Sequence, residues 1–208
     1  MFSMRLADGA AWRQVAETCL AFCFAASATY VLNDLADRES DRTHPIKKLR
    51  PLPSGRVSPT AAGAEAALFL AGAVVTAFGV NYLVGLIILA YIGLQLAYTH
   101  YLKHKMLVDV MCIALGFVLR AAAGAAAIPV EISPWLILCT FTVCLFMGFC
   151  KRRNEATTIG DAALAREHRR TLSGYTPELL THLITLSAGV AIVTYLLYAS
   201  SPITVERF

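Results

Sequence analysis

Long apolar blocks alternate with short polar segments along this chain. The blocks fall at about 15–32, 59–78, 81–99, 107–128, 132–150 and 179–199. Each is close to the ~20 residues that a helix needs to cross the hydrocarbon core of a bilayer. The pattern therefore predicts an all-α fold, an integral-membrane bundle of about six transmembrane helices.

One apolar stretch is too long for a single span. The run from Ala66 to Thr99 carries no charge over 34 residues. As one straight helix it would measure about 51 Å, against a bilayer core about 30 Å thick. A turn is therefore expected at Gly79-Val80-Asn81, with a helix on each side.

The composition agrees with this class of protein. Apolar residues make up 57% of the chain, charged residues only 15%, and the mean hydropathy is +0.60. Such values are far from those of an ordinary soluble domain. Residues 1–208 are therefore expected to form a single membrane domain, surrounded by membrane lipids.

Basic residues are distributed unevenly between the loops. Of the 18 Lys and Arg residues, 14 lie in the segments 33–58, 100–106 and 151–175, and the connections around 79–81 and 129–134 contain none. Basic short loops stay in the cytoplasm, so these three segments predict a multi-pass protein of the cell membrane with one cytoplasmic, basic face. Membrane topology thus explains the net charge of +4. The sequence shows no basic stretch interleaved with aromatic residues, the pattern that would indicate nucleic-acid binding.

Several residues of reactive or metal-binding types are expected to have structural roles. The six cysteines lie in or beside apolar blocks and are interpreted as buried packing residues, and a metal site at Cys19 and Cys23 would need further ligands. Trp135 and Tyr175 are expected to be interfacial anchors. His100 and His104 lack the Glu of a zinc protease motif, and a phosphate contact by His100 is the alternative to an interfacial position.

The strongest candidate for chemistry is an acidic segment that directly follows the first apolar block. At 100° per residue, Asn33, Asp37 and Asp41 fall at about 0°, 40° and 80° around a helix, with Asp34 at about 100°. Stacked carboxylates repel one another unless a cation lies among them. Oxygen donors of this kind suit Mg²⁺, whose coordination is commonly completed by phosphate oxygens, so a diphosphate substrate is expected.

The loop that follows adds positive charge. Lys47 and Arg50 come shortly after the acidic segment and can neutralise the charge of a departing diphosphate. The structural alternative for the whole segment is a solvated, charged helix end that stops the span at the interface.

Arg120 lies inside an apolar block, where a charge is costly unless it faces a cavity or a partner. It shares a helix face with Gly116 and Gly124, a small-residue face that another helix can approach closely. We expect it to point into the bundle, either as an anchor for substrate phosphate or as the partner of a buried carboxylate. Asp109 is about 16 Å away along the same helix, which argues against a direct pair with that residue.

These motifs together resemble a known family. The acidic segment has the pattern Asn-Asp-x-x-Asp-x-x-x-Asp, followed downstream by Lys-x-x-Arg-Pro, and is similar to the first aspartate motif of the UbiA superfamily. The segment 98–103, from Tyr98 to Lys103, resembles the Tyr-Ser-x-x-Leu-Lys segment of that superfamily. Further segments resemble the decaprenyl-phosphate phosphoribosyltransferase branch, at 107–110, 116–120, 132–135, 151–155 and 173–180. The resemblance implies an all-α membrane transferase that uses Mg²⁺ to activate a diphosphate.

The resemblance also bears on the substrates. Prenyl-donor members of the superfamily carry a second Asp-rich motif in the loop that corresponds to 151–175, and here that loop is basic, with only Glu155 and Asp161 near its start. A basic loop suits extra phosphates. The preferred reaction is transfer of 5-phosphoribosyl from phosphoribosyl diphosphate to a polyprenyl (decaprenyl) phosphate, and the alternative is transfer of a polyprenyl group from its diphosphate to an aromatic or lipid acceptor.

The expected site follows from both lines of reasoning. The metal ligands are Asn33, Asp34, Asp37 and Asp41; the catalytic residues are Asp37, Asp41 and Lys103; the substrate-binding residues are Lys47, Arg50, Tyr98, Arg120, Lys151, Arg152 and Glu155. In this hypothesis Lys47, Arg50 and Lys103 offset the charge of the diphosphate as the C–O bond breaks.

Two other classes of protein compete with this interpretation. A transporter or channel would use Arg120 and the acidic face along an ion path, but repeated halves and discontinuous helices are not visible. A non-catalytic membrane subunit is the other rival, because the family resemblance implies a chain truncated at both ends. Missing helices would be covered by a partner or a second copy of the chain. A soluble Asp-rich prenyl synthase is excluded by the hydropathy.

Overall fold

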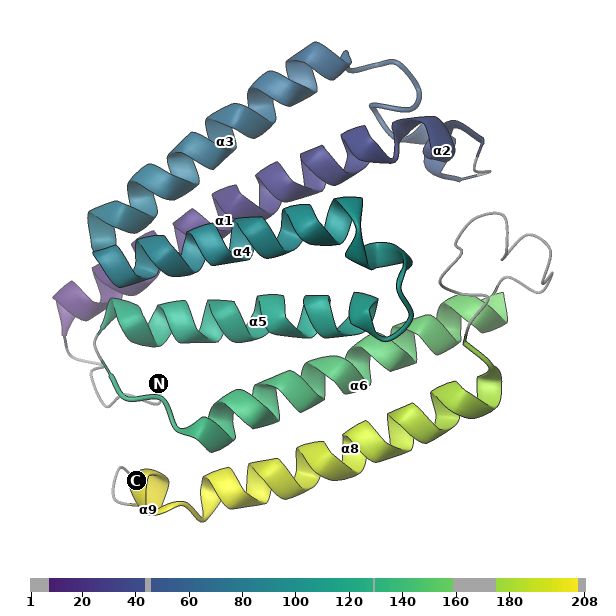
Figure 1. Ribbon diagram of the computed structural model, residues 1–208. Coiled ribbons are helices and arrows are strands. Elements are labelled where there is room, and N and C mark those ends of the chain that lie inside the picture. Colours follow the sequence, from purple (N-terminus) through teal and green to yellow (C-terminus); the bar gives the residue numbers. More distant parts are fainter. Residues whose placement is uncertain (1–7, 44–45, 129, 159–174, 206–208) are drawn as a thin grey trace.

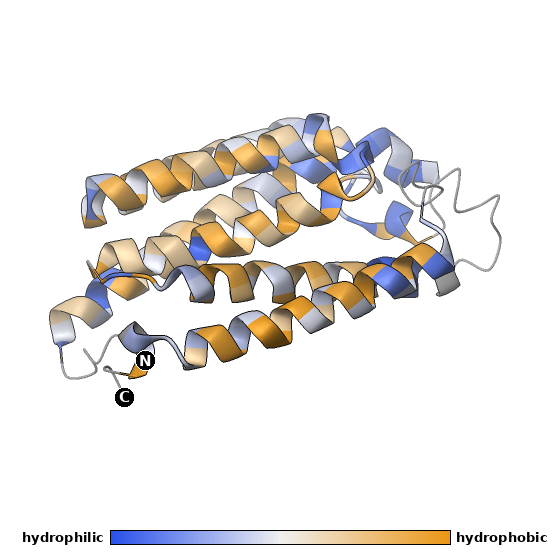
Figure 2. Ribbon diagram, turned by 60° about the horizontal axis from the view of Figure 1, so that its bottom comes forward, coloured by the Kyte–Doolittle hydropathy of each residue, from blue (hydrophilic) through white to orange (hydrophobic). Residues whose placement is uncertain are grey.

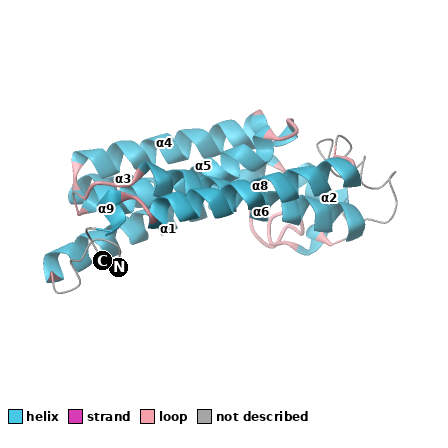
Figure 3. Ribbon diagram, turned by 90° about the horizontal axis from the view of Figure 1, so that it is seen from below, coloured by secondary structure: helices cyan, strands magenta, loops and turns pink. Residues whose placement is uncertain are grey.

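The computed structural model describes residues 8–43, 46–128, 130–158 and 175–205. Six long helices run through these ranges, α1 (Gly9–Ala36), α3 (Pro59–Val80), α4 (Tyr82–His100), α5 (Val108–Ala127), α6 (Pro134–Thr158) and α8 (Pro177–Ala199). Short helices α2 (Arg38–Thr43) and α9 (Pro202–Val205) and the 3₁₀ turns η1 (Lys47–Leu49) and η2 (Leu102–His104) complete them. The described ranges contain no strand (Figure 3).

Each long helix contains a segment that is long and apolar enough to cross a membrane. The prediction of an all-α membrane bundle with about six spans is therefore confirmed. The largest difference in bounds is at α6, which ends eight residues after its predicted block, and α1 begins six residues before its own. Asp8 caps this end, because its carboxylate accepts hydrogen bonds from the backbone N–H groups of Ala10 and Ala11 at 3.0 and 3.2 Å.

The turn between α3 and α4 is a single residue. Asn81 adopts an extended backbone conformation, and its side-chain oxygen accepts a hydrogen bond from the N–H of Val84, 2.9 Å away. Its amide nitrogen also donates to the carbonyl of Ala126 at the end of α5, over 3.0 Å. One side chain thus caps α4 and ties the α3–α4 turn to the next hairpin, at the position predicted from the length of the apolar run.

The long helices lie side by side in the order α3, α1, α4, α5, α6, α8 (Figure 1). The main core lies among α1, α3, α4 and α5, where fully buried alanines let the helices approach closely around larger side chains. Phe22 on α1 meets Tyr91 on α4 edge to face, with ring centroids 5.2 Å apart. This packing fixes α4 and α5 against α1, the helix that carries the acidic segment.

Polar residues gather at one end of the bundle. Figure 2 shows apolar colours along the helices and hydrophilic colours where α1 runs into α2. The described parts of the three basic loops meet at this end, because side chains of the α1–α3, α4–α5 and α6–α8 connections contact one another there. The candidate site is built from these contacts.

Candidate active site at the polar end of the bundle

The acidic segment forms one continuous helical face with a local break. α1 ends at Ala36 and α2 begins at Arg38, and Asp37 between them has φ −92° and ψ 0°. Its N–H still bonds to the carbonyl of Asn33 at 2.9 Å, and the N–H of Asp41 bonds to the carbonyl of Asp37 at 2.8 Å. Because the i to i−4 bonding continues through the break, the polar side chains of both helices stay on one side.

Arg50 joins two of the carboxylates. Its Nη1 lies 3.0 Å from Oδ1 of Asp34 and 3.3 Å from Oδ2 of Asp41. Lys47 approaches Asp41 as well, with 3.5 Å between Nζ and Oδ1. The Asp41 side chain is only 3% exposed beneath these two cations. Two carboxylates from separate helices therefore converge on one positively charged atom.

Lys103 meets the third carboxylate from the other side. Its Nζ lies 2.5 Å from Oδ1 of Asp37, and the side chain is 12% exposed. The amide of Asn33 donates to Asp37 over 3.3 Å and accepts a hydrogen bond from the Thr99 hydroxyl over 3.4 Å. The structure thus brings together the α1–α2 face and the α4–α5 loop, which lie about 66 residues apart in the chain. Thr99 is a contact that the sequence reasoning missed.

The donor set fits a magnesium ion that shares its ligands with a substrate. No group of three His, Cys, Asp or Glu residues in the described ranges stands close enough together to hold a metal alone. Mg²⁺ is usually bound through one or two carboxylates, with substrate phosphate oxygens and waters in its remaining positions. Asp34 and Asp41 already converge on one cation, the Arg50 guanidinium, and the donors are all oxygen.

A second polar cluster lies on the other side of the α4–α5 loop. Arg152, near the end of α6, donates from Nε to Asp109 at 2.8 Å and from Nη1 to Glu155 at 2.6 Å. Asp109 is fully buried, and the Arg152 side chain is 2% exposed. A buried pair of this kind costs about 3–5 kcal/mol to break by removing one partner. Arg152 was expected to bind substrate, and its side chain is engaged with these two carboxylates.

Tyr175 completes this cluster, contrary to the expectation of an interfacial anchor. It is buried, its hydroxyl donates to Asp109 over 2.9 Å, and the same oxygen accepts the N–H of Leu107 over 2.7 Å. Burial, together with the neighbouring Asp109 carboxylate, raises the pKa of Tyr175 above its ordinary value, so the hydroxyl stays protonated and can donate. No pattern within one helix could have indicated this contact, because it joins segments 66 residues apart.

The remaining predicted residues at this end differ in exposure. Tyr98 is half-buried near the end of α4, whereas Lys151 is exposed on the last turns of α6. Glu155 is 28% exposed beside Arg152. Asp161 and the basic residues at 166, 169 and 170 lie outside the described residues.

Arg120 points into the bundle, as predicted, but far from the acidic face. Its Nη2 donates to the Tyr91 hydroxyl over 2.7 Å, and its guanidinium lies 4.9 to 5.9 Å from the ring centroids of Tyr91, Phe117 and Phe22. Twelve residues of helix, about 18 Å, separate it from the start of α5. Gly116 packs against Tyr91 as the small-residue face predicts, whereas a Cβ at Gly124 would contact nothing within 4 Å.

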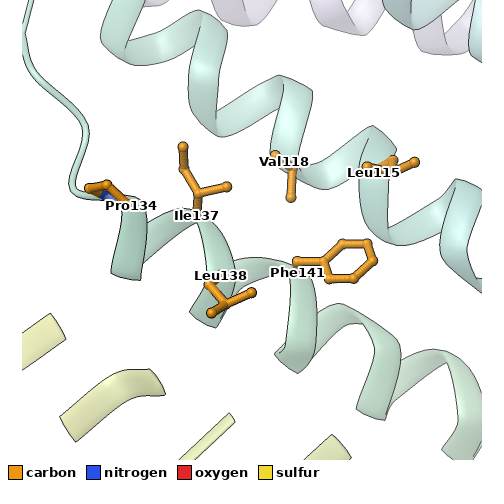
Figure 4. A pocket seen from close by; sticks show the side chains of 6 residues that line it. All are labelled: Leu115, Val118, Pro134, Ile137, Leu138 and Phe141. Carbon is orange, nitrogen blue, oxygen red and sulfur yellow. The ribbon is translucent and has the colours of Figure 1, made fainter. Parts of the chain in front are cut away.

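An apolar hollow and the cysteines are further features of the spans. A hollow of about 350 Å³ lies between α5 and α6, lined only by apolar side chains (Figure 4): Leu115, Val118, Pro134, Ile137, Leu138 and Phe141. Of the cysteines, Cys112 is buried but Cys19 and Cys23 are exposed, so the expectation that all six are buried packing residues is wrong. The exposed pair has no further ligand that would make a metal site among the described residues.

Comparison with known proteins agrees with the geometry. Residues 1–205 match the UbiA prenyltransferase family. The chain is 35% identical to decaprenyl-phosphate phosphoribosyltransferases from Mycolicibacterium smegmatis, over 90% of this chain and 58% of that protein, and from Corynebacterium glutamicum, over 88% and 55%. The chain thus spans less than two thirds of the length of these curated relatives.

A solved structure has the same fold. The UbiA homolog from Archaeoglobus fulgidus, determined with GPP and Mg²⁺ bound, superposes with a TM-score of 0.80 at 22% identity. The match covers 96% of this chain and 72% of that one. The helical arrangement in Figure 1 is therefore the fold of that A. fulgidus protein.

Proposed function

The chain belongs to the UbiA prenyltransferase family, and on that premise we propose that it is a Mg²⁺-dependent membrane transferase. In the proposed reaction, 5-phosphoribosyl passes from phosphoribosyl diphosphate to a polyprenyl phosphate such as decaprenyl phosphate. Two relatives that carry this activity in their names are each 35% identical to the chain. The observation that carries the proposal is the cluster in which Arg50 bridges Asp34 and Asp41 while Lys103 holds Asp37.

The metal has a defined place in this proposal. Asn33, Asp34, Asp37 and Asp41 supply the oxygen donors, and bound Mg²⁺ would neutralise charge on the diphosphate as a Lewis acid. The A. fulgidus homolog was solved with Mg²⁺ bound, which supports the same assignment for this fold. The basic side chains that now pair with these carboxylates are the ones available to a diphosphate.

The chain's own residues would then act on the leaving group. Arg50, Lys47 and Lys103 each form an ion pair with a carboxylate of the acidic face. Each can release that carboxylate and bind a phosphate oxygen instead. As the bond between ribose C1 and the diphosphate oxygen breaks, they stabilise the charge that develops on that oxygen. The lipid phosphate oxygen attacks C1 from the opposite side, and diphosphate leaves.

The second cluster faces the other side of the α4–α5 loop. We assign Lys151 and Tyr98 to contacts with the ribose phosphate or the lipid phosphate, and Glu155 to the ribose hydroxyls, because these side chains retain some exposure. Arg152 positions Glu155 through their 2.6 Å bond. Arg120 lies too deep to reach the diphosphate, and we assign it to the lipid substrate within the bundle.

Transfer of a polyprenyl group to an aromatic or lipid acceptor is the alternative reaction. The family description and the GPP bound to the A. fulgidus homolog favour it. The absence of an Asp-x-x-x-Asp sequence after α6 argues against it, because prenyl donors in the superfamily use a second Asp-rich motif.

The proposal includes a location for the site. The six spans make this a multi-pass membrane protein. We propose that it lies in the cell membrane as a single membrane domain over residues 1–208, with the acidic face and the basic loops on the cytoplasmic side, where a soluble phosphoribosyl donor is available.

The test is transfer by the detergent-purified chain. Labelled phosphoribosyl diphosphate with polyprenyl phosphate is assayed with and without Mg²⁺, in parallel with polyprenyl diphosphate and aromatic acceptors. We expect label in a phosphoribosyl lipid, and we expect Asp37→Asn to lower the rate by about a hundredfold or more, as for other groups that organise transition-state charge. Glu39→Gln is the matched control, because Glu39 is 73% exposed and pairs with Arg42.

The outcomes separate the reactions. Label in a prenylated acceptor alone would replace the preferred reaction with the alternative. Full activity of Asp37→Asn, or equal loss in Glu39→Gln, would refute the assignment of the acidic face. Failure of the folded wild-type chain in both assays would refute the proposed activity for this chain.

A further inference from the structure

The α4–α5 loop is held from both sides of the candidate site. On one side Lys103 contacts Asp37 of the acidic face. On the other side Leu107 and Asp109 bond to Tyr175 and Arg152, which belong to the segment before α8 and to α6. Only three residues separate Lys103 from Leu107. The positions of Leu107 and Asp109 therefore limit where the Lys103 side chain can lie.

Leu107 has a backbone conformation that requires support. Its φ is +67°, a region that non-glycine residues rarely adopt, and its side chain provides no cap for α5. The hydroxyl of Tyr175 accepts the Leu107 N–H at 2.7 Å and donates to Asp109 at 2.9 Å. One hydroxyl therefore stabilises the turn and donates a hydrogen bond to the buried Asp109 carboxylate in the first turn of α5.

The helices approach closely at the same place. A Cβ at Gly148 of α6 would collide with the Val110 side chain of α5. Gly148 lies one helical turn before Arg152, and Val110 follows Asp109 directly. The glycine therefore permits the spacing at which the Arg152 guanidinium reaches Asp109 over 2.8 Å.

We propose that Tyr175, Asp109 and Arg152 form a positioning clamp that sets the α4–α5 loop so that Lys103 reaches the diphosphate site. These three residues contact no substrate in this proposal and act through Lys103. The inference rests on the proposed function for the identity of the diphosphate site, but the placement of Lys103 can be measured separately. Tyr175 remains a neutral donor because burial raises the pKa of its hydroxyl.

The test uses Tyr175→Phe in the full chain, which keeps the ring and removes the bridging hydroxyl. The primary readout is the rate at which an amine-acylating reagent modifies Lys103, measured by peptide mass spectrometry. Lys47 serves as the internal reference, because it pairs with Asp41 on the opposite side of the site. Tyr101→Phe is the matched control, because that ring is 72% exposed in the same loop.

We expect the acylation rate of Lys103 to rise about tenfold in Tyr175→Phe, because the loss of a hydrogen bond to a charged group has an effect of about this size. The acylation rate of Lys47 should not change. We also expect calorimetry to show about tenfold weaker binding of inorganic diphosphate with Mg²⁺. Asp109→Asn, which retains the shape of the side chain but not its charge, should act in the same direction. Tyr101→Phe should match the wild type in both measurements.

Each outcome decides the proposal. Unchanged acylation of Lys103 in both clamp variants would overturn it. Equal increases at Lys103 and Lys47 would also overturn it, because they would indicate general unfolding rather than local positioning. A selective increase at Lys103 in a chain that does not bind diphosphate would support the clamp and refute the proposed function instead.

Discussion

At the scale of single residues, Arg50 has two opposing effects on the site. It bridges Asp34 and Asp41 through one nitrogen, so it competes with any metal for those carboxylates. In the proposed reaction the same guanidinium stabilises the leaving diphosphate. A residue in this position should weaken metal binding in the absence of substrate and accelerate transfer in its presence.

Arg50→Met should therefore change two quantities in opposite directions. The affinity for Mg²⁺ without diphosphate should rise about fivefold, because a half-exposed ion pair contributes about 1 kcal/mol. The transfer rate should fall by about a hundredfold, the usual loss for one transition-state donor. Calorimetric titration with Mg²⁺ and the transfer assay measure the two effects.

Arg42→Met provides the comparison, because Arg42 is 44% exposed and pairs with Glu39 outside the cluster. It should leave both quantities close to those of the wild type. Parallel loss of metal affinity and rate in Arg50→Met would mean that Arg50 supports the fold of the site and does not compete with the metal.

The placement of single residues could be predicted where it depends on neighbours in sequence. Helical spacing alone predicts that Asn33, Asp34, Asp37 and Asp41 lie on one side, and the structure places them there. Their role as metal ligands stays a prediction. Tyr175 was misassigned to the interface, because its partners Leu107 and Asp109 lie 66 to 68 residues away. Such a contact depends on which helices become neighbours, and periodicity within one helix carries no information about that choice.

At the scale of elements, hydropathy located the helices and left their ends uncertain. The turn at Asn81 followed from a limit on length, since one helix could not span residues 66–99 within a bilayer. The early start of α1 could not follow from hydropathy, because Arg13 and Gln14 lower the hydropathy just before the predicted block. Arg13 and Glu17 are paired there at 3.8 Å, and Asp8 caps the end. The break at Asp37 is likewise a local backbone feature without a sequence signal.

The packing of α5 against α6 gives an element-scale prediction. Gly148→Ala would place a methyl group against Val110, which is fully buried and β-branched and therefore has little freedom to move. We expect overpacking to lower the free energy of unfolding by about 1–3 kcal/mol. Thermal unfolding in detergent, followed by circular dichroism, measures the change.

Gly189→Ala is the matched substitution on α8, where an added Cβ would meet nothing within 4 Å. It should leave stability unchanged or raise it by up to about 1 kcal/mol, because alanine is the better helix former. Equal stability of the two variants would show that α5 and α6 can separate without cost, and the close approach would then not fix Arg152 beside Asp109.

At the scale of the whole molecule, the loops that carry the chemistry share one end of an antiparallel bundle. The alternation of spans predicted this arrangement, because every second connection is rich in Lys and Arg. The contacts from Lys103 to Asp37 and from Tyr175 to Leu107 confirm that the three loops meet. Sequence could not show that the α4–α5 loop lies between two polar clusters, since that depends on the lateral order of the helices.

The side of the membrane on which this end lies can be tested without any substitution. The chain has five lysines, Lys47, Lys48, Lys103, Lys105 and Lys151, and all lie in the three basic loops. A membrane-impermeant amine reagent should therefore modify lysines in inverted membrane vesicles and not in intact cells, with the exposed Lys48 and Lys105 reacting first. Peptide mass spectrometry identifies the modified positions. Labelling of these lysines in intact cells would place the acidic face outside the cell, away from a cytoplasmic phosphoribosyl donor, and would contradict the proposed location of the site.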